Sequence, residues 1–157
     1  METIKPEIRA RIADRIVRGP FGQHVNFELV SADTDTCTVR LPFSPNIANG
    51  VGVIHGGVIS ALVDTCAVGA AWASPRNDNA TRGATVGLTV NYLAPGLESD
   101  LLGVATIVRR GGSICIVNVN VHDTDARHIA TGLVTYRLRQ AKLAEAATAS
   151  VLGDSSD

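Results

Sequence analysis

The sequence GVISALVDTCAVGAAWA occupies residues 57–73. This run is apolar on nearly every face of a helix, is rich in alanine and is too long for one buried strand. We therefore predict a buried central helix over Gly57–Ala73. Asp64 breaks the apolar pattern, and a lone charge removed from water costs several kcal/mol unless it is paired. Because unusual buried carboxylates cluster at functional sites, we favour a functional role for Asp64 over a bond to water, to a backbone donor or to a cation from another strand.

Four strand-like runs follow this helix. Turn-forming residues separate them, and each separation is a reasonable hairpin signal. In the third run apolar and polar residues alternate, which is typical of a strand with one buried face. The runs are Ala84–Leu93, Leu101–Arg109, Ser113–His122 and His128–Leu138, and the turns are Pro95-Gly96, Gly111-Gly112 and Asp123-Thr124-Asp125.

The chain before the central helix supplies a lead helix and a hairpin. Apolar residues at helical spacing between Pro6 and Gly19 predict a short amphipathic helix. The runs His24–Val30 and Cys37–Leu41 suit strands, and Ser31–Asp35 supplies turn formers between them. Together with the later strands, this pattern predicts an α+β fold in which a curved antiparallel sheet wraps around a central helix.

The length of 157 residues suits one domain of ordinary size. We place the main domain over residues 21–140, after a lead helix in residues 1–20. The alanine-rich tail at residues 141–157 is a frayed helix or a disordered segment.

The composition argues against several classes of function. With a formal net charge of -1 and 4% aromatic residues, the chain has no broad basic surface and little material for stacking on bases, so we expect no nucleic-acid partner. Neither a run of about 20 apolar residues nor a signal peptide is present, so we expect a cytoplasmic protein that does not bind membranes. The three cysteines lack the pattern of disulfides or zinc sites, and the four histidines lack the spacing of metal ligands.

The residues His55-Gly56-Gly57 lie where the preceding loop becomes the central helix. The first N–H groups of a helix are unpaired and lie at its positive end, and a glycine lets a carbonyl approach them closely. The motif therefore either forms an oxyanion hole or is a plain tight turn into the helix. Gly56 and Asp64 are eight residues apart, which is about 12 Å along one helix. A site that uses both therefore needs the helix of a second subunit.

These residues form a recognisable pattern that resembles the hot-dog acyl-CoA thioesterases of the phenylacetate-catabolism (PaaI) type. The similarity runs from about Gly22 to Leu138. It implies a hot-dog fold, acyl-CoA as substrate, thioester hydrolysis at a dimer interface, a homodimer as the minimal active unit and a homotetramer as the common assembly. The residues that carry the resemblance are Asn49, His55-Gly56-Gly57, Asp64, Thr85 and Asn91-Tyr92-Leu93-Ala94-Pro95.

The resemblance also implies roles for individual residues. Asp64 would be the nucleophile or general base, and the N–H of Gly56 would polarise the thioester carbonyl. Asn49 would orient the thioester or the water, and Thr85 aligns with a family hydroxyl that helps to position water. No metal or organic cofactor is implied.

Four further residues complete the predicted site. His55 would order the loop or contact the substrate, and Gly57 would belong to the substrate-binding surface. Arg109 and Arg110 precede a glycine turn near the place where this family binds the nucleotide end of CoA, and paired guanidiniums suit its phosphates. A solvated hairpin tip is the alternative for this pair.

Two other functions stay open. Hot-dog hydratases and dehydratases also act on acyl thioesters, but they usually pair a histidine with an acid differently from His55 and Asp64. A non-catalytic protein that holds acyl-CoA is the third candidate, and no helix-turn-helix segment or basic stretch favours it. Hydrolysis is therefore the leading hypothesis, and aromatic, medium-chain and long-chain acyl groups all fit it.

Overall fold

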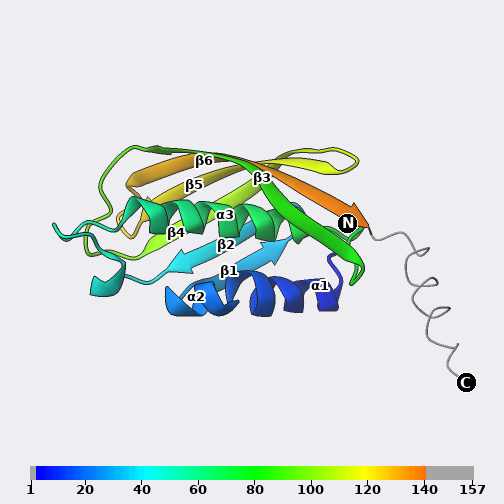
Figure 1. The fold of residues 1–157 in the computed structure, drawn as a ribbon, viewed down its shortest axis with the longest axis horizontal. Helices are drawn as coiled ribbons and strands as arrows, with labels where there is room; N and C mark the ends of the chain where they lie inside the picture. The colour runs from blue at the N-terminus through cyan, green and yellow to red at the C-terminus, as the bar shows by residue number, and fades with distance from the viewer. Residues whose placement is uncertain (1–2, 141–157) are drawn as a thin grey trace, which may run out of the picture.

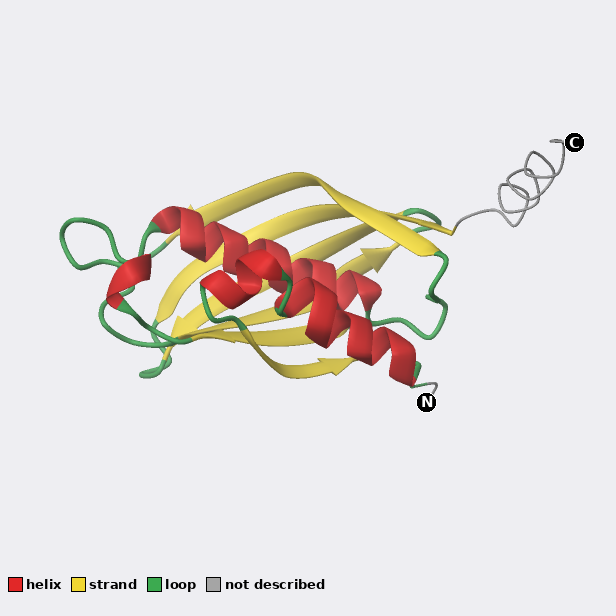
Figure 2. Ribbon diagram, turned by 60° about the horizontal axis from the view of Figure 1, so that its bottom comes forward, coloured by secondary structure: helices red, strands yellow, loops and turns green. Residues whose placement is uncertain are grey.

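A six-stranded antiparallel sheet curves around one long helix (Figure 1). This architecture comes from a computed structural model, which describes residues 3–140. The strand order is β1-β2-β4-β5-β6-β3, and the helices lie on one side of the sheet (Figure 2). The predicted α+β hot-dog fold is therefore confirmed. In chain order the elements are α1 (Pro6–Arg11), η1 (Ile12–Val17, a π-helix), α2 (Pro20–His24), β1 (Glu28–Asp33), β2 (Thr36–Leu41), η2 (Pro45–Ile47), α3 (Gly56–Trp72), β3 (Thr81–Tyr92), β4 (Leu101–Arg110), β5 (Ile114–Asp123) and β6 (His128–Gln140).

Helix α3 is the predicted central helix, and it packs on the inner face of the sheet. Its Leu62, Val63 and Cys66 side chains have 0% exposure. A Cβ at Gly103 of β4 would lie 2.6 Å from the Cys66 sulfur, so this strand can approach α3 closely only because residue 103 has no side chain. The alternation in β5 also matches the prediction, since the residues that face α3 are all buried. They are Cys115, Val117, Val119 and Val121.

The connection between β3 and β4 is not the hairpin that the sequence suggested. Strand β3 pairs with β6, whereas β4 lies between β2 and β5. The Pro95-Gly96 turn instead packs against the loop before α3, where the Gly96 carbonyl accepts a 2.8 Å hydrogen bond from the Ile54 N–H. Turn residues predict a local change of direction, but they do not determine which strand becomes the neighbour.

The N-terminal region contains the predicted lead helix and one helix more. Pro20 begins α2, which ends at His24, so the prediction of a strand from His24 was wrong. Asn26 has a φ of 61°, which turns the chain between α2 and β1. The hairpin that follows is confirmed, with Thr34-Asp35 as its turn. Ile8, Ile12 and Val17 of the lead helix are buried in the same core as α3.

No helix within residues 3–140 is both long enough and apolar enough to cross a membrane. The predicted C-terminal tail, residues 141–157, lies outside the described residues.

Candidate active site

One stripe of α3 faces β3, and two of the five predicted catalytic residues, Gly56 and Asp64, lie along it. Gly56, Ser60 and Asp64 follow one another at intervals of four residues, which places them on one side of the helix. The Thr85 hydroxyl of β3 donates a 2.6 Å hydrogen bond to Oδ1 of Asp64. Farther along β3, the Tyr92 hydroxyl donates to the Gly56 carbonyl at 2.9 Å and lies 2.6 Å from the Ser60 hydroxyl. The structure therefore brings Asp64 and Thr85 together.

A β-bulge in β3 makes both of these contacts possible. The register of β3 against β6 shifts between Thr85 and Gly87, so Val86 is an extra residue. Side chains alternate between the two faces of a regular strand, which would point Thr85 away from the face that Val90 and Tyr92 share. The bulge reverses the alternation, so that Thr85 and Tyr92 both contact α3 while Val90 packs on the core.

His55 is the N-cap of α3 and leaves one backbone donor unused. Its Nδ1 accepts a 2.9 Å hydrogen bond from the Gly57 N–H, so the imidazole proton of a neutral ring is on Nε2. The His55 carbonyl accepts from the N–H groups of Val58 and Ile59. Within residues 3–140, the N–H of Gly56 is then the one first-turn donor without an acceptor. A free N–H at the positive end of a helix is suited to bind an oxyanion.

Asn49 braces the loop that leads to His55. Its side-chain oxygen accepts hydrogen bonds from the N–H groups of Val51 and Val53, at 3.0 and 3.1 Å. The His55 N–H in turn donates to the Ile47 carbonyl at 2.8 Å. Asn49 therefore holds the loop in shape, and the role in orienting a thioester that the resemblance implies remains a prediction.

Asp64 is half-buried rather than fully enclosed in the single chain. Burial raises the pKa of the neighbouring Tyr136, and the Asp64 charge adds to this rise. Because Gly56 and Asp64 both lie in α3, the eight-residue separation keeps them about 12 Å apart along the helix axis. One chain therefore cannot bring both groups to one carbonyl.

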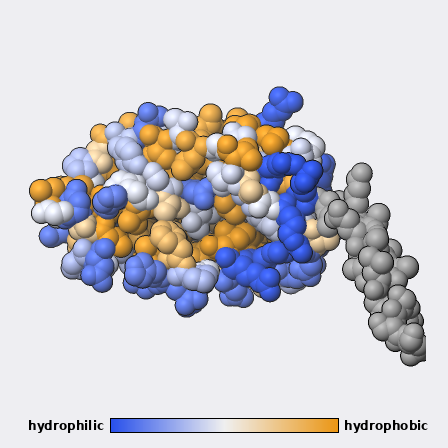
Figure 3. Space-filling model, viewed as in Figure 1, coloured by the Kyte–Doolittle hydropathy of each residue, from blue (hydrophilic) through white to orange (hydrophobic). Residues whose placement is uncertain are grey.

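The side of α3 that the sheet does not cover remains partly open, and β3 beside it is an edge strand. Strand β3 has 12 residues, and Val86, Leu88 and Tyr92 on it are 56%, 42% and 52% exposed. Apolar side chains are visible across this view of the molecule (Figure 3). A long edge strand with exposed apolar residues is a ready pairing surface for another chain. The half-buried residues of α3 along the open side are Ser60, Ala61, Asp64, Thr65 and Val68.

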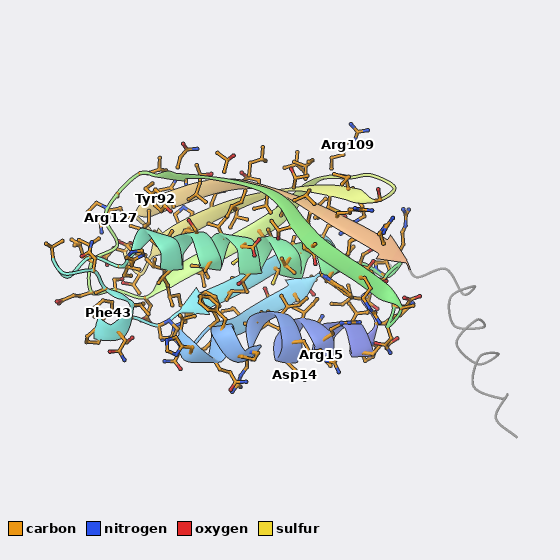
Figure 4. The ribbon with its side chains drawn as sticks, viewed as in Figure 1. Asp14, Arg15, Phe43, Tyr92, Arg109 and Arg127 are labelled. Carbon is orange, nitrogen blue, oxygen red and sulfur yellow. The ribbon has the colours of Figure 1, made fainter. Side chains whose placement is uncertain are left out.

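Arg109 and Arg110 have different environments, although they are neighbours in sequence. Arg109 is exposed and projects from the sheet into solvent (Figure 4). The side chain of Arg110 is 16% exposed, and its guanidinium forms an ion pair with Asp35 at 2.7 Å. It also donates hydrogen bonds to the carbonyls of Ala70 and Ala71 at 3.2 and 3.0 Å, near the C-terminal end of α3. The structure thus gives Arg110 a role in holding α3 that the sequence did not suggest.

The three cysteines are buried, which bears on whether they could act as nucleophiles. Burial raises the pKa of the Cys37 thiol to about 12 and that of Cys66 well above its ordinary value, so both thiols stay protonated. Cys115 is also buried and forms no disulfide. Among residues 3–140, no three His, Cys, Asp or Glu side chains are grouped closely enough to hold a metal ion.

Sequence reasoning missed Ser60 and the role of Tyr92. Ser60 lies one helical turn after Gly56 and one before Asp64, so its spacing could have revealed it. Tyr92 belongs to the recognised pattern, but its contact with Gly56 depends on how β3 crosses the helix.

Comparison with known proteins identifies one family. The model of the thioesterase superfamily matches residues 51–130, about half of the chain. A putative esterase of Halobacterium salinarum is 28% identical over 109 residues, which cover 64% of this chain and 72% of the relative. Human acyl-coenzyme A thioesterase 13 is 25% identical over 142 residues, which cover 90% of this chain and 91% of the relative.

Solved structures share the fold. A thioesterase family protein from Silicibacter pomeroyi has a TM-score of 0.78 at 19% identity, covering 85% of this chain and 99% of that one. The E. coli PaaI protein from the phenylacetic acid degradation operon has a TM-score of 0.69 at 16% identity, covering 83% and 92%. The family match confirms the resemblance to thioesterases, and the solved structures, the PaaI protein among them, confirm the fold.

The contacts of Arg110 lead to a prediction about stability. Arg110→Ala removes the ion pair with Asp35 and the bonds to two helix carbonyls. We expect the free energy of unfolding to fall by about 2 kcal/mol, the scale of hydrogen bonds that involve a charged group. Urea denaturation followed by circular dichroism measures this change.

Arg109→Ala is the matched control, because it removes the same side chain from the adjacent, exposed position. Its effect should stay within about 0.5 kcal/mol. Equal losses of stability in the two variants would contradict the structural role of Arg110.

Proposed function

The chain belongs to the thioesterase superfamily, and we propose that it hydrolyses the thioester of an acyl-CoA to a free acid and CoA. The observation that carries the proposal is that α3 presents two groups suited to thioester hydrolysis. One is the Asp64 carboxylate, held by Thr85, and the other is the Gly56 N–H, left free by the His55 cap. One relative is named an acyl-coenzyme A thioesterase, and its match to this chain extends over 91% of its length. This name supports acyl-CoA as the substrate.

Two copies of the chain would build each site. In this arrangement the edge strands β3 pair across a two-fold axis, and Gly56 of the partner subunit approaches Asp64. The exposed apolar residues of β3 and the open stripe of α3 support this contact, because pairing would remove both from water. A two-fold axis produces two equivalent sites, each with Asp64 from one subunit and Gly56 from the other.

The outer face of the sheet supports a further association into a homotetramer. Leu102 and Val104 alternate with buried residues along β4 and are 37% and 38% exposed, and Val108, at the register shift of β4 against β5, is 63% exposed. Leu133 of β6 adds to this apolar face at 51% exposure. A second dimer covering it would remove these side chains from water.

The proposed mechanism uses these groups in a fixed order. The partner's Gly56 N–H donates to the thioester carbonyl oxygen and stabilises the negative charge that forms on it. Asp64 either attacks the carbonyl carbon or takes a proton from the water that attacks it. The C–S bond then breaks and CoA leaves as a thiolate. When water attacks, the acyl group leaves directly as the free acid; when Asp64 attacks, water then hydrolyses the acyl anhydride on Asp64 to the free acid and restores the carboxylate. Thr85 keeps the Asp64 carboxylate in one orientation through Oδ1 and leaves Oδ2 available for the reaction.

We keep Arg109 as the proposed contact for the nucleotide end of CoA, because its guanidinium is exposed. Arg110 is not a suitable residue with which to test CoA binding. Its guanidinium is occupied inside the chain, so its removal would change stability together with KM.

Asp64→Asn tests the carboxylate directly. The substitution keeps the shape and the acceptor for Thr85 but removes the charge and the base. We expect kcat for release of CoA to fall by about 10²- to 10⁴-fold, the usual contribution of a general base, with little change in the unfolding midpoint. A thiol-detecting assay with a panel of acyl-CoAs measures the rate. A folded variant with full activity would refute the role of Asp64.

Gly56→Pro tests the backbone donor. Proline has no N–H, and position 56 is the first residue of α3, where proline fits a helix well. We expect kcat to fall by about 10²- to 10³-fold, as when one oxyanion donor is removed. Gly56→Ala is the matched control, since it retains the N–H and its Cβ lies no closer than 3.4 Å to Tyr92. Equal losses in the two variants would show that space, rather than the N–H, matters at this position.

Mixed dimers test whether the site is shared. A dimer of one Asp64→Asn chain and one Gly56→Pro chain keeps one intact site, because Asp64 of the second chain meets Gly56 of the first. Random mixing of the two inactive variants should therefore restore about a quarter of the wild-type activity, since half of the dimers are mixed and each has one of two sites. If each site lay within one chain, mixing would restore nothing.

A further inference from the structure

A pocket lies outside the proposed active site, between the N-terminal helices and the start of β3. Its volume is about 500 Å³. Strongly hydrophilic residues gather at this end of the molecule, over α1 and the start of β3 (Figure 3). Asp14 and Arg15 project from the N-terminal helical segment there (Figure 4). The residues that line the pocket are Glu7, Ala10, Arg11, Asp14, Arg15, Asn79 and Arg82.

The pocket has a mostly helical wall and a second wall from β3. Five lining residues between Glu7 and Arg15 recur at intervals of three and four, so they share one face of the lead helix. The opposite face carries Ile8 and Ile12, which are buried in the core and fix the orientation of the helix. The packing of these apolar side chains in the core therefore holds the polar face of the helix toward the pocket.

Two guanidiniums are fixed side by side in this pocket. The Asn79 carbonyl accepts hydrogen bonds from Nη1 of Arg11 at 3.3 Å and from Nη1 of Arg82 at 2.7 Å. Arg11 also lies over the ring of Trp72, with 4.5 Å from its Cζ to the ring centroid. Because these bonds use only Nη1, the remaining N–H groups of both side chains can bind a ligand. Arg15 extends the row by one helical turn.

The positive charge of these arginines is not neutralised by ion pairs. Within residues 3–140, none of the five ion pairs includes a residue that lines the pocket. Partial burial lowers the pKa of Arg11, and the charges of Arg82 and Arg15 lower it further. Glu7 and Asp14 also line the pocket, so its lining contains three positively and two negatively charged side chains. An anion between the guanidiniums would relieve their repulsion.

We propose that this pocket binds a phosphate-bearing ligand through Arg11, Arg15 and Arg82. Arginine suits phosphate because its planar fork of N–H groups matches two phosphate oxygens at once. The carboxylates of Glu7 and Asp14 would accept hydrogen bonds from hydroxyl groups of the same ligand. The phosphate belongs either to a separate phosphorylated metabolite or to the nucleotide end of the CoA substrate, in which case this pocket, rather than Arg109, holds that end. Ligand binding to this pocket is measured without turnover. The result therefore does not depend on whether the chain hydrolyses thioesters.

Calorimetric titration of the full chain with inorganic pyrophosphate tests the proposal. We expect saturable binding at constant ionic strength, where sodium chloride at the same ionic strength gives none. Trp72 is the single tryptophan of the chain, so a change in its fluorescence would place the bound anion beside Arg11. Arg15→Ala and Arg82→Ala should each weaken binding about tenfold, as expected for the loss of a charge-assisted contact.

Arg18→Ala is the matched control, because Arg18 is exposed, follows the same helical segment and does not line the pocket. It should bind pyrophosphate like the wild type. The proposal is overturned if pyrophosphate does not bind, or if Arg15→Ala binds it unchanged. Arg15 has an exposed side chain, so a failure of that variant to fold is not expected.

A kinetic comparison then separates the two sources of phosphate. KM is measured for an acyl-CoA and for the same acyl group on pantetheine, which has no phosphate. If Arg15→Ala raises KM for the acyl-CoA alone, the pocket holds the phosphates of the substrate. If it weakens pyrophosphate binding and leaves both KM values unchanged, the ligand is a separate metabolite. Both results support the pocket, and neither depends on the variants at Asp64 or Gly56.

Discussion

The apolar side chains of α3 gain free energy when they are removed from water, and within residues 3–140 the chain buries only part of the surface of this helix. The sheet covers Leu62, Val63 and Cys66 completely, and β4 comes close because Gly103 has no side chain. Burial of such surface is the main favourable contribution to folding, so this contact stabilises the packing of the sheet on α3. The other side of the helix stays half-open and carries Asp64. Asp64 thus lies at the edge of the helix surface that one chain buries. In the proposed dimer, a second chain would cover the surface beyond this edge.

Strand β3 determines which groups meet at this edge of the helix surface. Its bulge at Val86 changes the alternation of side chains, so that Thr85 reaches Asp64 and Tyr92 reaches Gly56 along a single strand. A regular strand could present only one of the two contacts to α3. The N-cap has a comparable effect on the backbone, because His55 satisfies the neighbouring donors and leaves Gly56 free. Both features are local departures from regular structure at the place where function is proposed.

Some arginines of the chain are held by partners inside it, and others keep N–H groups that can bind a ligand. Arg110 is held by Asp35 and by carbonyls near the end of α3, where a cation also interacts favourably with the helix dipole. Arg40 of β2 forms ion pairs with Glu28 of β1 and with Asp100, which directly precedes β4. Arg11 and Arg82, by contrast, meet at a carbonyl and keep most of their N–H groups for other partners. This difference in partners separates the arginines that stabilise the fold from those that can bind an anion.

The sequence by itself determined the central helix, the strand-like runs and the residues that carry the family resemblance, because hydrophobic periodicity and short motifs are local properties of the chain. It also singled out Asp64, since a carboxylate in an apolar helix is visible without a structure. Only the tertiary structure decided that β3 lies beside β6, that Thr85 faces Asp64 and that Arg110 belongs to the interior while Arg109 does not. The physical reason is that pairing, strand phase and ion-pair partners depend on residues far apart in sequence. Adjacent arginines have the same local signal, and only packing distinguishes them.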